Sequence, residues 1–191
     1  RSYREIESER ELANIHGTFY ELPLVVNDKP PLFQKLRPVS SHRKQIGDFA
    51  SWNGMLVMTG VGAKEKESLH VYRSEDGKEA LWFGGIDDLW KLGKPVGVGG
   101  PWKNTRVKAG EASDPYLMTG YDKKSLVLSV DEPTEVTLEI NFDHHGYHVY
   151  RTWKVTPGKA VRFEFPKAFS AHWARLVAIG DCVASAVFTY E

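Results

Sequence analysis

The sequence has little cysteine and no long apolar run, and each shortage excludes a class of protein. Cys182 is the one cysteine among 191 residues, so no disulfide can form within the chain. It lies in the alternating stretch CVASAVFTYE, which predicts a small buried apolar residue and not a catalytic thiol. No apolar run approaches the roughly 20 residues of a transmembrane helix, so we expect no membrane span.

An excess of charge of either sign is also lacking. Lys plus Arg and Asp plus Glu number 25 each, which leaves no basic field for a nucleic-acid partner. The chain opens RSYREIESERELA, without Met and without the pattern of charge followed by an apolar stretch that marks a signal peptide. We therefore expect a mature product or a piece of a longer chain, with residues 1–15 as a charged lead-in that forms a helical turn or is frayed.

No segment shows a sustained helical period, and short alternating segments take its place. Val136, Leu138 and Ile140 alternate with polar residues, which predicts a strand with one face in a core. Such segments recur every 8–12 residues through 116–191, a spacing typical of a β-sandwich. We predict seven strands there: YLMTGY, KSLVLSV, TEVTLEINF, YHVYRTWKV, KAVRFEF, WARLVAI and CVASAVFTY.

Residues 16–85 predict about five short antiparallel strands joined by tight turns. Asn53-Gly54 separates two apolar runs and is a strong hairpin signal, because both residues of a type I′ turn need positive φ. The set resembles one blade of a propeller, and a lone blade cannot bury both faces. It packs on the sandwich or belongs to a propeller whose other blades lie elsewhere. The predicted fold class is thus all-β, a blade-like antiparallel sheet followed by a seven-stranded β-sandwich.

The stretch Phe83–Trp102 reads FGGIDDLWKLGKPVGVGGPW and lies between these two parts. Its glycines lack the G-x-G-x-x-G spacing and no helix follows them, so they favour turns over phosphate binding. We interpret residues 86–115 as a joint between domains, plugged by three indoles. The alternative is a carbohydrate-stacking platform, because clefts form at such joints and indoles bury well against flat apolar faces. The indoles belong to Trp82, Trp90 and Trp102.

Two adjacent aspartates, Asp87 and Asp88, are candidate ligand-binding residues within this stretch. Carboxylates are the hard oxygen ligands that calcium prefers, and glycine-rich backbone can add carbonyls. The Asp-x-Asp-x-Asp spacing is absent, however, and neighbouring side chains of an extended chain point in opposite directions. The alternatives are a polar contact to a ligand or an aspartate that caps a short turn at DLWKLG.

The segment NFDHHGYHVY places a carboxylate and three imidazoles within six residues, a composition that suits zinc. In a hairpin, DHHG is the turn itself, so His144 and His145 lie at its tip and His148 on the returning strand. No fourth ligand is evident. We therefore prefer a polar loop tip, with His144 and His145 as candidate sugar contacts because sandwich loops commonly carry binding.

His42, in VSSHRKQ, is the candidate for proton transfer. A polysaccharide lyase needs a base, and a cation that neutralises the uronate carboxylate. His42 with Arg43 and Lys44 has that chemistry. Polar neighbours before a strand are also commonly just solvated, which is the alternative. No G-x-S-x-G elbow occurs.

Several runs together resemble a known group of proteins: SHRKQIGDFASWNGMLVMTGV, ALWFGGIDDLWKLGKPVGVGGPW, SDPYLMTGYDKKSLVLS and FSAHWARLVA. The group comprises large uncharacterised bacterial proteins, secreted or periplasmic, that carry a β-propeller followed by a β-sandwich. They are similar in architecture to propeller-type polysaccharide lyases and glycosidases. The resemblance runs from about Ile15 to the end and transfers no catalytic residue.

Three hypotheses follow. The first is a carbohydrate-associated accessory or structural region of a secreted, propeller-containing protein, which binds a polysaccharide or oligosaccharide without being catalytic on its own. The second is part of the active site of a polysaccharide lyase or glycoside hydrolase. The third is a protein-interaction or oligomerisation module formed by an exposed sheet edge. If the chain is a fragment, the upstream propeller is its partner.

Overall fold

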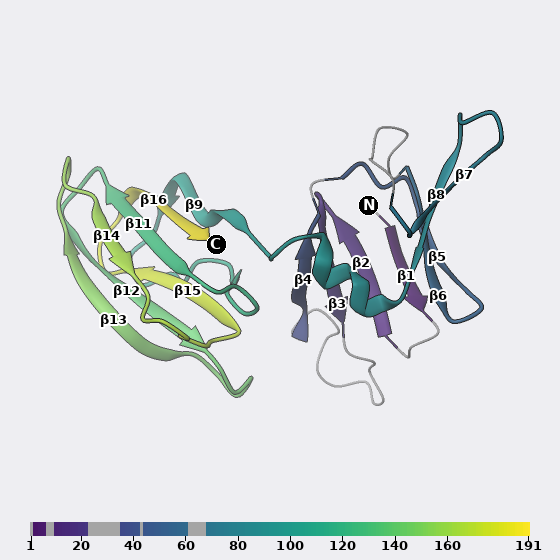
Figure 1. Cartoon of the computed structure of the whole chain (residues 1–191). Coiled ribbons are helices and arrows are strands. Elements are labelled where there is room, and N and C mark those ends of the chain that lie inside the picture. Colours follow the sequence, from purple (N-terminus) through teal and green to yellow (C-terminus); the bar gives the residue numbers. More distant parts are fainter. Residues whose placement is uncertain (1, 7–9, 23–34, 43, 61–67) are drawn as a thin grey trace. The chain divides into compact units, whose positions relative to one another are not determined.

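The computed structural model describes residues 2–6, 10–22, 35–42, 44–60 and 68–191. Its regular structure is strand, apart from short 3₁₀ segments, so the prediction of an all-β fold is confirmed. The chain divides into two compact units, Arg1–Pro95 and Val96–Glu191 (Figure 1). No helix among the described residues has both the length and the hydropathy that crossing a membrane requires.

The first unit contains two four-stranded antiparallel sheets. One follows the chain in order β1-β2-β3-β4, and the other has the order β5-β6-β8-β7 and is followed by the 3₁₀ helix η2 (Ile86–Leu92). The strands are β1 (Ser2–Ile6), β2 (Arg10–Ile15), β3 (Thr18–Leu22), β4 (Arg37–Ser41), β5 (Phe49–Trp52), β6 (Met55–Thr59), β7 (Val71–Arg73) and β8 (Ala80–Gly84).

The predicted charged lead-in is the first difference from expectation, because β1 and β2 form there. Leu12 pairs with Glu21 across the β2–β3 ladder, and its side chain is almost fully buried in the core of the unit. Local composition suggested a helical turn or a frayed end. Cross-strand pairing and burial of Leu12 outweigh it, since strand preference depends on packing context more than on intrinsic propensity.

One hydrophobic cluster is shared by both sheets of the first unit. Phe19 of β3 meets Phe49 of β5 edge-on, with ring centroids 5.4 Å apart. The hairpin at Asn53-Gly54 forms as predicted, with φ of 48° and 74°. The buried members of the cluster are Leu12, Phe19, Phe49, Leu56, Met58, Trp82 and Leu89.

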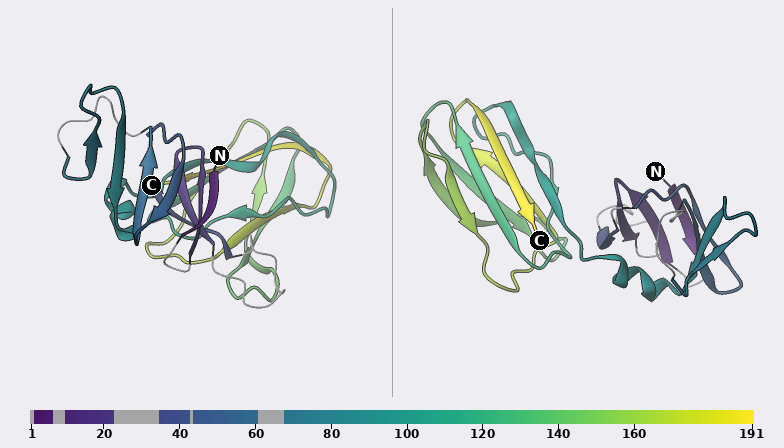
Figure 2. Two further views of the ribbon diagram at one scale, coloured as in Figure 1. Left: turned by 90° about the vertical axis from the view of Figure 1, so that its right-hand side faces the viewer. Right: turned by 45° about the horizontal axis from the view of Figure 1, so that its top comes forward.

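The second unit is a sandwich of two four-stranded antiparallel sheets, with orders β10-β15-β12-β13 and β14-β11-β16-β9. Figures 1 and 2 show the two sheets of this unit facing each other. The strands are β9 (Gly97–Val107), β10 (Tyr116–Leu117), β11 (Lys124–Val130), β12 (Thr134–Asn141), β13 (His148–Val155), β14 (Val161–Glu164), β15 (Trp173–Ala178) and β16 (Cys182–Tyr190).

The seven predicted strands of the sandwich are all present, and β9 is an additional one. This strand lies within residues 86–115, the segment interpreted as a joint, so the second unit begins at Val96 and not at residue 116. β9 pairs along β16 with two register shifts. At Gly100 a Cβ atom would overlap the carbonyl oxygen of Ala186, which explains why glycine is required there.

The sandwich core follows the period of two that its sequence shows. Along β16, residues from Cys182 to Tyr190 alternate between buried and half-buried. Cys182 is buried, and burial, followed by the charges of Asp131 and Asp181, raises the pKa of its thiol. It is thus the small buried apolar residue that its position predicts, in a site that disfavours the reactive thiolate.

Candidate functional site

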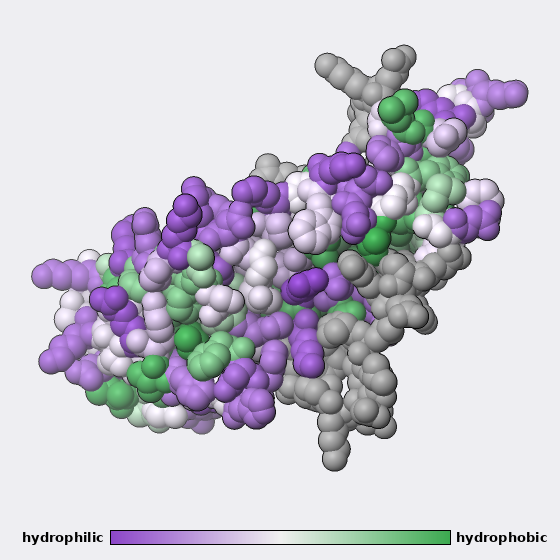
Figure 3. All heavy atoms as spheres, turned by 60° about the horizontal axis from the view of Figure 1, so that its bottom comes forward, coloured by the Kyte–Doolittle hydropathy of each residue, from purple (hydrophilic) through white to green (hydrophobic). Residues whose placement is uncertain are grey.

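An exposed hollow lies on the outward face of the sheet β5-β6-β8-β7. It encloses about 630 Å³ and is lined mainly by apolar side chains, with Arg73, Ser74 and Glu79 as polar members. On the face shown in Figure 3, hydrophobic surface gathers towards the end of the first unit that contains this sheet. We call this site the aromatic hollow, lined by Trp52, Met55, Leu69, Tyr72, Arg73, Ser74, Glu79, Ala80, Leu81 and Phe83.

The alternation of the strands explains why apolar residues reach the outward face. In β6 and β8 the residues Leu56, Met58 and Trp82 point into the core. Their neighbours in sequence, Met55 and Phe83, must then point outwards, because successive side chains of a strand lie on opposite faces. Both faces of the sheet are therefore apolar, although only one is covered within the described part of the unit.

Three aromatic rings of the hollow are fixed against one another. Trp52 and Tyr72 both meet Phe83 edge-on, with centroid distances of 6.2 and 5.4 Å. These two residues remain 57% and 65% exposed, so each ring has open surface for a ligand. Aromatic rings that are held in place but exposed lose little conformational entropy when a flat partner covers them.

The polar side of the hollow comes from the turn between β7 and β8. Ser74 Oγ donates a hydrogen bond of 2.6 Å to Asp76 Oδ1, and the Lys78 amide donates to the same oxygen. These bonds lower the pKa of the Asp76 carboxyl, and the bond from Ser74 has the largest effect. The turn thus holds Ser74 beside the aromatic rings.

The three predicted indoles of the joint do not meet as one cluster. Trp82 is buried in the first unit, where it stacks on His70 with centroids 5.2 Å apart. Trp102 is buried in the core of the second unit. Trp90, on η2, is 64% exposed. The interpretation of a joint plugged by these residues is therefore corrected: two of them serve separate cores, because Trp82 lies on a strand of the first unit and Trp102 on a strand of the second.

The two aspartates have different environments, since Asp88 is bonded within a turn and Asp87 faces solvent. Asp88 accepts a hydrogen bond of 2.8 Å from the Gly85 amide and one of 2.6 Å from Lys91 Nζ, whereas Asp87 is exposed. These two hydrogen bonds lower the pKa of the Asp88 carboxyl, and the bond from Lys91 has the larger effect. The alternative of a capping aspartate is confirmed. Within the described ranges, no three His, Cys, Asp or Glu side chains gather as metal ligands do.

The histidine segment forms the tip of the β12–β13 hairpin, as predicted. His145 is exposed, and its Nδ1 lies 2.7 Å from the carbonyl oxygen of Asp143. His144 has a φ of 63° and its ring lies 4.7 Å from that of His172, which precedes β15. Nδ1 of His145 and Nε2 of His148 lie 4.0 and 3.7 Å from Asp143 Oδ2. These distances are typical of long polar contacts at a loop tip.

His42 is in the interior of the first unit and not at its surface. Only 4% of the residue is exposed, and its ring lies 5.0 Å from that of Phe19. Nε2 lies 3.0 Å from Asn14 Oδ1, and Nδ1 accepts a hydrogen bond from the Lys44 amide. Because both ring nitrogens have protein partners, the neutral Nε2–H tautomer satisfies the site. The geometry gives His42 a structural role.

Sequence reasoning therefore missed the aromatic hollow. The signal was present in the runs MLVM and ALWF. Both are apolar at successive positions, whereas a strand with one buried face alternates apolar with polar residues. The side chains that build the hollow come from three separated segments, and only strand pairing brings them together. Tyr72 pairs with Leu81, and Val57 pairs with Phe83.

Known proteins offer few matches to this chain. No protein-family model matches the chain, and no curated protein matches it. One similar solved structure is that of a glycoside hydrolase family 43 arabinoxylan arabinofuranohydrolase from Bacillus subtilis in complex with cellotetraose. The identity is 11% and the TM-score 0.27, and the match covers 94% of this chain and 52% of that one. The chain thus spans about half the length of that structure.

Proposed function

We propose that this chain is a carbohydrate-associated accessory region of a secreted or periplasmic protein, and that it binds an oligosaccharide at the aromatic hollow. The observation that carries the proposal is the pair Trp52 and Tyr72, each more than half exposed and each held edge-on against Phe83. Such rings bury the flat C–H face of a sugar and gain from removing both surfaces from water.

The size and chemistry of the hollow suit this ligand. Its volume of about 630 Å³ lies within the range of small-molecule sites, which are mostly apolar with a few placed polar groups. Arg73 donates hydrogen bonds and the Glu79 carboxylate accepts them, so neighbouring sugar hydroxyls find both kinds of partner.

The test is a calorimetric titration of the full chain with neutral and acidic oligosaccharides. We expect saturable binding to at least one of them and a loss of tenfold or more in Trp52→Ala and Tyr72→Ala. Trp90→Ala is the matched control, since Trp90 is as exposed as Trp52 but lies on η2, outside the hollow. Equal losses in Trp52→Ala and Trp90→Ala, or no binding to any glycan, would contradict the proposal.

A second candidate function is an interaction module, which the two apolar faces of the sheet β5-β6-β8-β7 favour. Leu69 is 98% exposed, and Leu81 and Met55 are also open on this side. In a longer protein, further blades of a propeller would cover such a face. Size-exclusion chromatography with light scattering separates the two ideas. A monomer that binds glycan favours the first, and self-association lost in Tyr72→Ser favours the second.

The enzymatic alternative, part of a lyase or glycosidase active site, has less support. Its one candidate base, His42, is buried with both ring nitrogens engaged. We therefore propose no catalytic residue in this chain. Unchanged turnover of the full-length protein after His42→Gln, in a variant that folds normally, is the expected result.

A further inference from the structure

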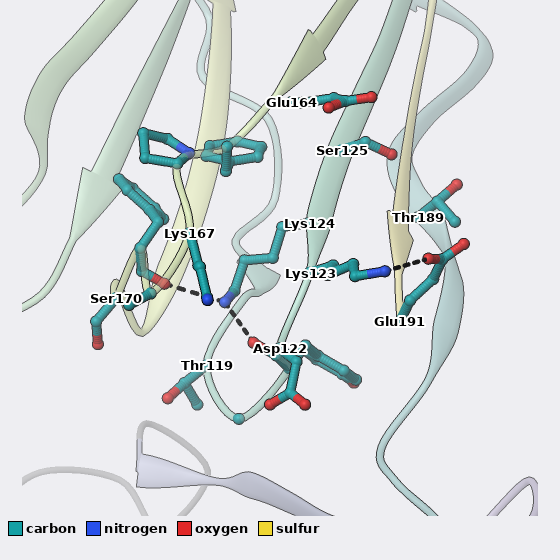
Figure 4. Close-up of a pocket in the computed structure, with 16 residues that line it drawn as sticks. Thr119, Asp122, Lys123, Lys124, Ser125, Glu164, Lys167, Ser170, Thr189 and Glu191 are labelled. Carbon is teal, nitrogen blue, oxygen red and sulfur yellow. Dashed lines mark hydrogen bonds and ion pairs between the residues drawn. The ribbon is translucent and has the colours of Figure 1, made fainter.

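A second hollow lies in the other unit, at one end of the sandwich. It encloses about 970 Å³ between the β10–β11 loop (118–123) and the β14–β15 loop (165–172), next to the end of β16 (Figure 4). We call it the terminal hollow. It differs in chemistry from the aromatic hollow, because lysines, carboxylates and hydroxyls line much of it.

Lys124 is the buried charge of this hollow. Only 8% of the residue is exposed, yet its side chain lines the hollow from the first position of β11. Nζ donates to the carbonyl oxygens of Tyr121 at 2.6 Å and Phe169 at 3.0 Å, and so ties together the two loops that form the walls (Figure 4). A lysine ammonium has three N–H donors, and these bonds use two of them.

The ammonium of Lys124 has no carboxylate within ion-pair distance in the described part of the chain. Asp122 acts on it only at longer range, and Glu191 lies 3.8 Å from the neighbouring Lys123 instead. Burial lowers the pKa of Lys124, which reflects the cost of holding its charge away from water. A buried charge is normally compensated by an opposite charge, and here two neutral carbonyls stand in that place.

We propose that the terminal hollow binds a small ligand through a carboxylate group, which would be the counter-ion of Lys124. The third N–H of the ammonium would meet the carboxylate. Lys167, an exposed lysine of the same lining, would add a second cation. Asp122 and Glu164 also line the hollow, which favours a ligand with a single carboxylate over a polyanion.

A uronic acid and a simple organic acid share this chemistry, so the experiment compares three probes on the full chain. Sodium glucuronate, glucose and sodium acetate are titrated while amide shifts are recorded by NMR. We expect glucuronate to bind at least tenfold more tightly than glucose, with shifts at Lys124, Phe169 and their neighbours. Equal affinities for acetate and glucuronate would assign recognition to the carboxylate alone. A weaker affinity for acetate would show that the sugar ring also contacts the protein. Both results support the site.

Equal affinity for glucuronate and glucose, or shifts outside the terminal hollow, would overturn the proposal. This comparison uses the unaltered protein, so it does not depend on any variant folding. As a further arm, Lys124→Met is expected to lose at least tenfold in affinity for glucuronate. Lys154→Met is its control, since Lys154 is an exposed lysine of β13 outside the hollow. Because the aromatic hollow lies in the other unit, the shift map distinguishes failure here from failure of the proposed function.

Discussion

Nε2 of His42 lies 3.0 Å from Oδ1 of Asn14, and the bond joins β2 to the residue after β4 inside the first unit. Burial, followed by the charge of Lys44, lowers the pKa of His42. The folded protein therefore holds this imidazole neutral, and protonation would leave an uncompensated charge in an apolar interior.

This pair gives the first unit a stability that depends on pH. When a histidine has a lower pKa folded than unfolded, the unfolded chain binds more protons between the two values. Stability is then fully present above the unfolded pKa of 6.5 and falls as the pH drops below it. The slope is at most about 1.4 kcal/mol per pH unit for one group. Urea unfolding at pH 7.5, 6 and 5 measures it.

His42→Gln should flatten this dependence, because the amide does not titrate. His145→Gln is the control, since the His145 side chain is 87% exposed. If the control flattens the curve as much as His42→Gln, the titrating group is not His42.

Trp82 and Trp90 make a matched pair for a test of the joint interpretation. Trp82→Ala removes a buried indole from the first core and is expected to cost about 3–5 kcal/mol. Trp90→Ala removes an exposed indole and should change stability by about 0.5 kcal/mol or less. Denaturant unfolding monitored by circular dichroism gives both values. Similar costs for the two variants would show that Trp90 is covered in solution.

Gly100→Ala tests the close approach of β9 to β16. The added Cβ would overlap the Ala186 carbonyl, so we expect the second unit to lose about 1–3 kcal/mol. Gly97→Ala, in the same strand, meets its nearest atom at 3.7 Å and should be tolerated. Thermal unfolding of the two variants is the measurement. A stable Gly100→Ala protein would mean that β9 does not lie against β16 at this position.

Cys182 should behave as an inert thiol. Because it is buried and its pKa is raised, we expect no reaction with a disulfide reagent at pH 8 while the protein is folded. Addition of guanidinium should release one reactive thiol per chain, since the sequence contains one cysteine. Complete reaction of the folded protein within seconds would place the start of β16 at the surface.

The sequence by itself determined the all-β class, the turn at Asn53-Gly54 and the seven strands from 116 onwards. These features are local: a period of two and a pair of turn residues are visible without knowing which strands pair. The role of an aspartate in capping DLWKLG was also visible, because a cap needs only a neighbour three residues away.

The features that depend on contacts between distant parts of the chain were decided by the tertiary structure alone. Local composition made residues 1–15 a lead-in and β9 part of a joint. The pairing of β1 with β2, of β2 with β3 and of β9 with β16 instead makes strands of the described residues there. Pairing also sent Trp82 and Trp102 into different cores and gathered Trp52, Tyr72 and Phe83 from three segments. The burial of Lys124 depends on two loops that meet only in the folded unit. Burial is set by neighbours distant in the chain, and composition does not record them.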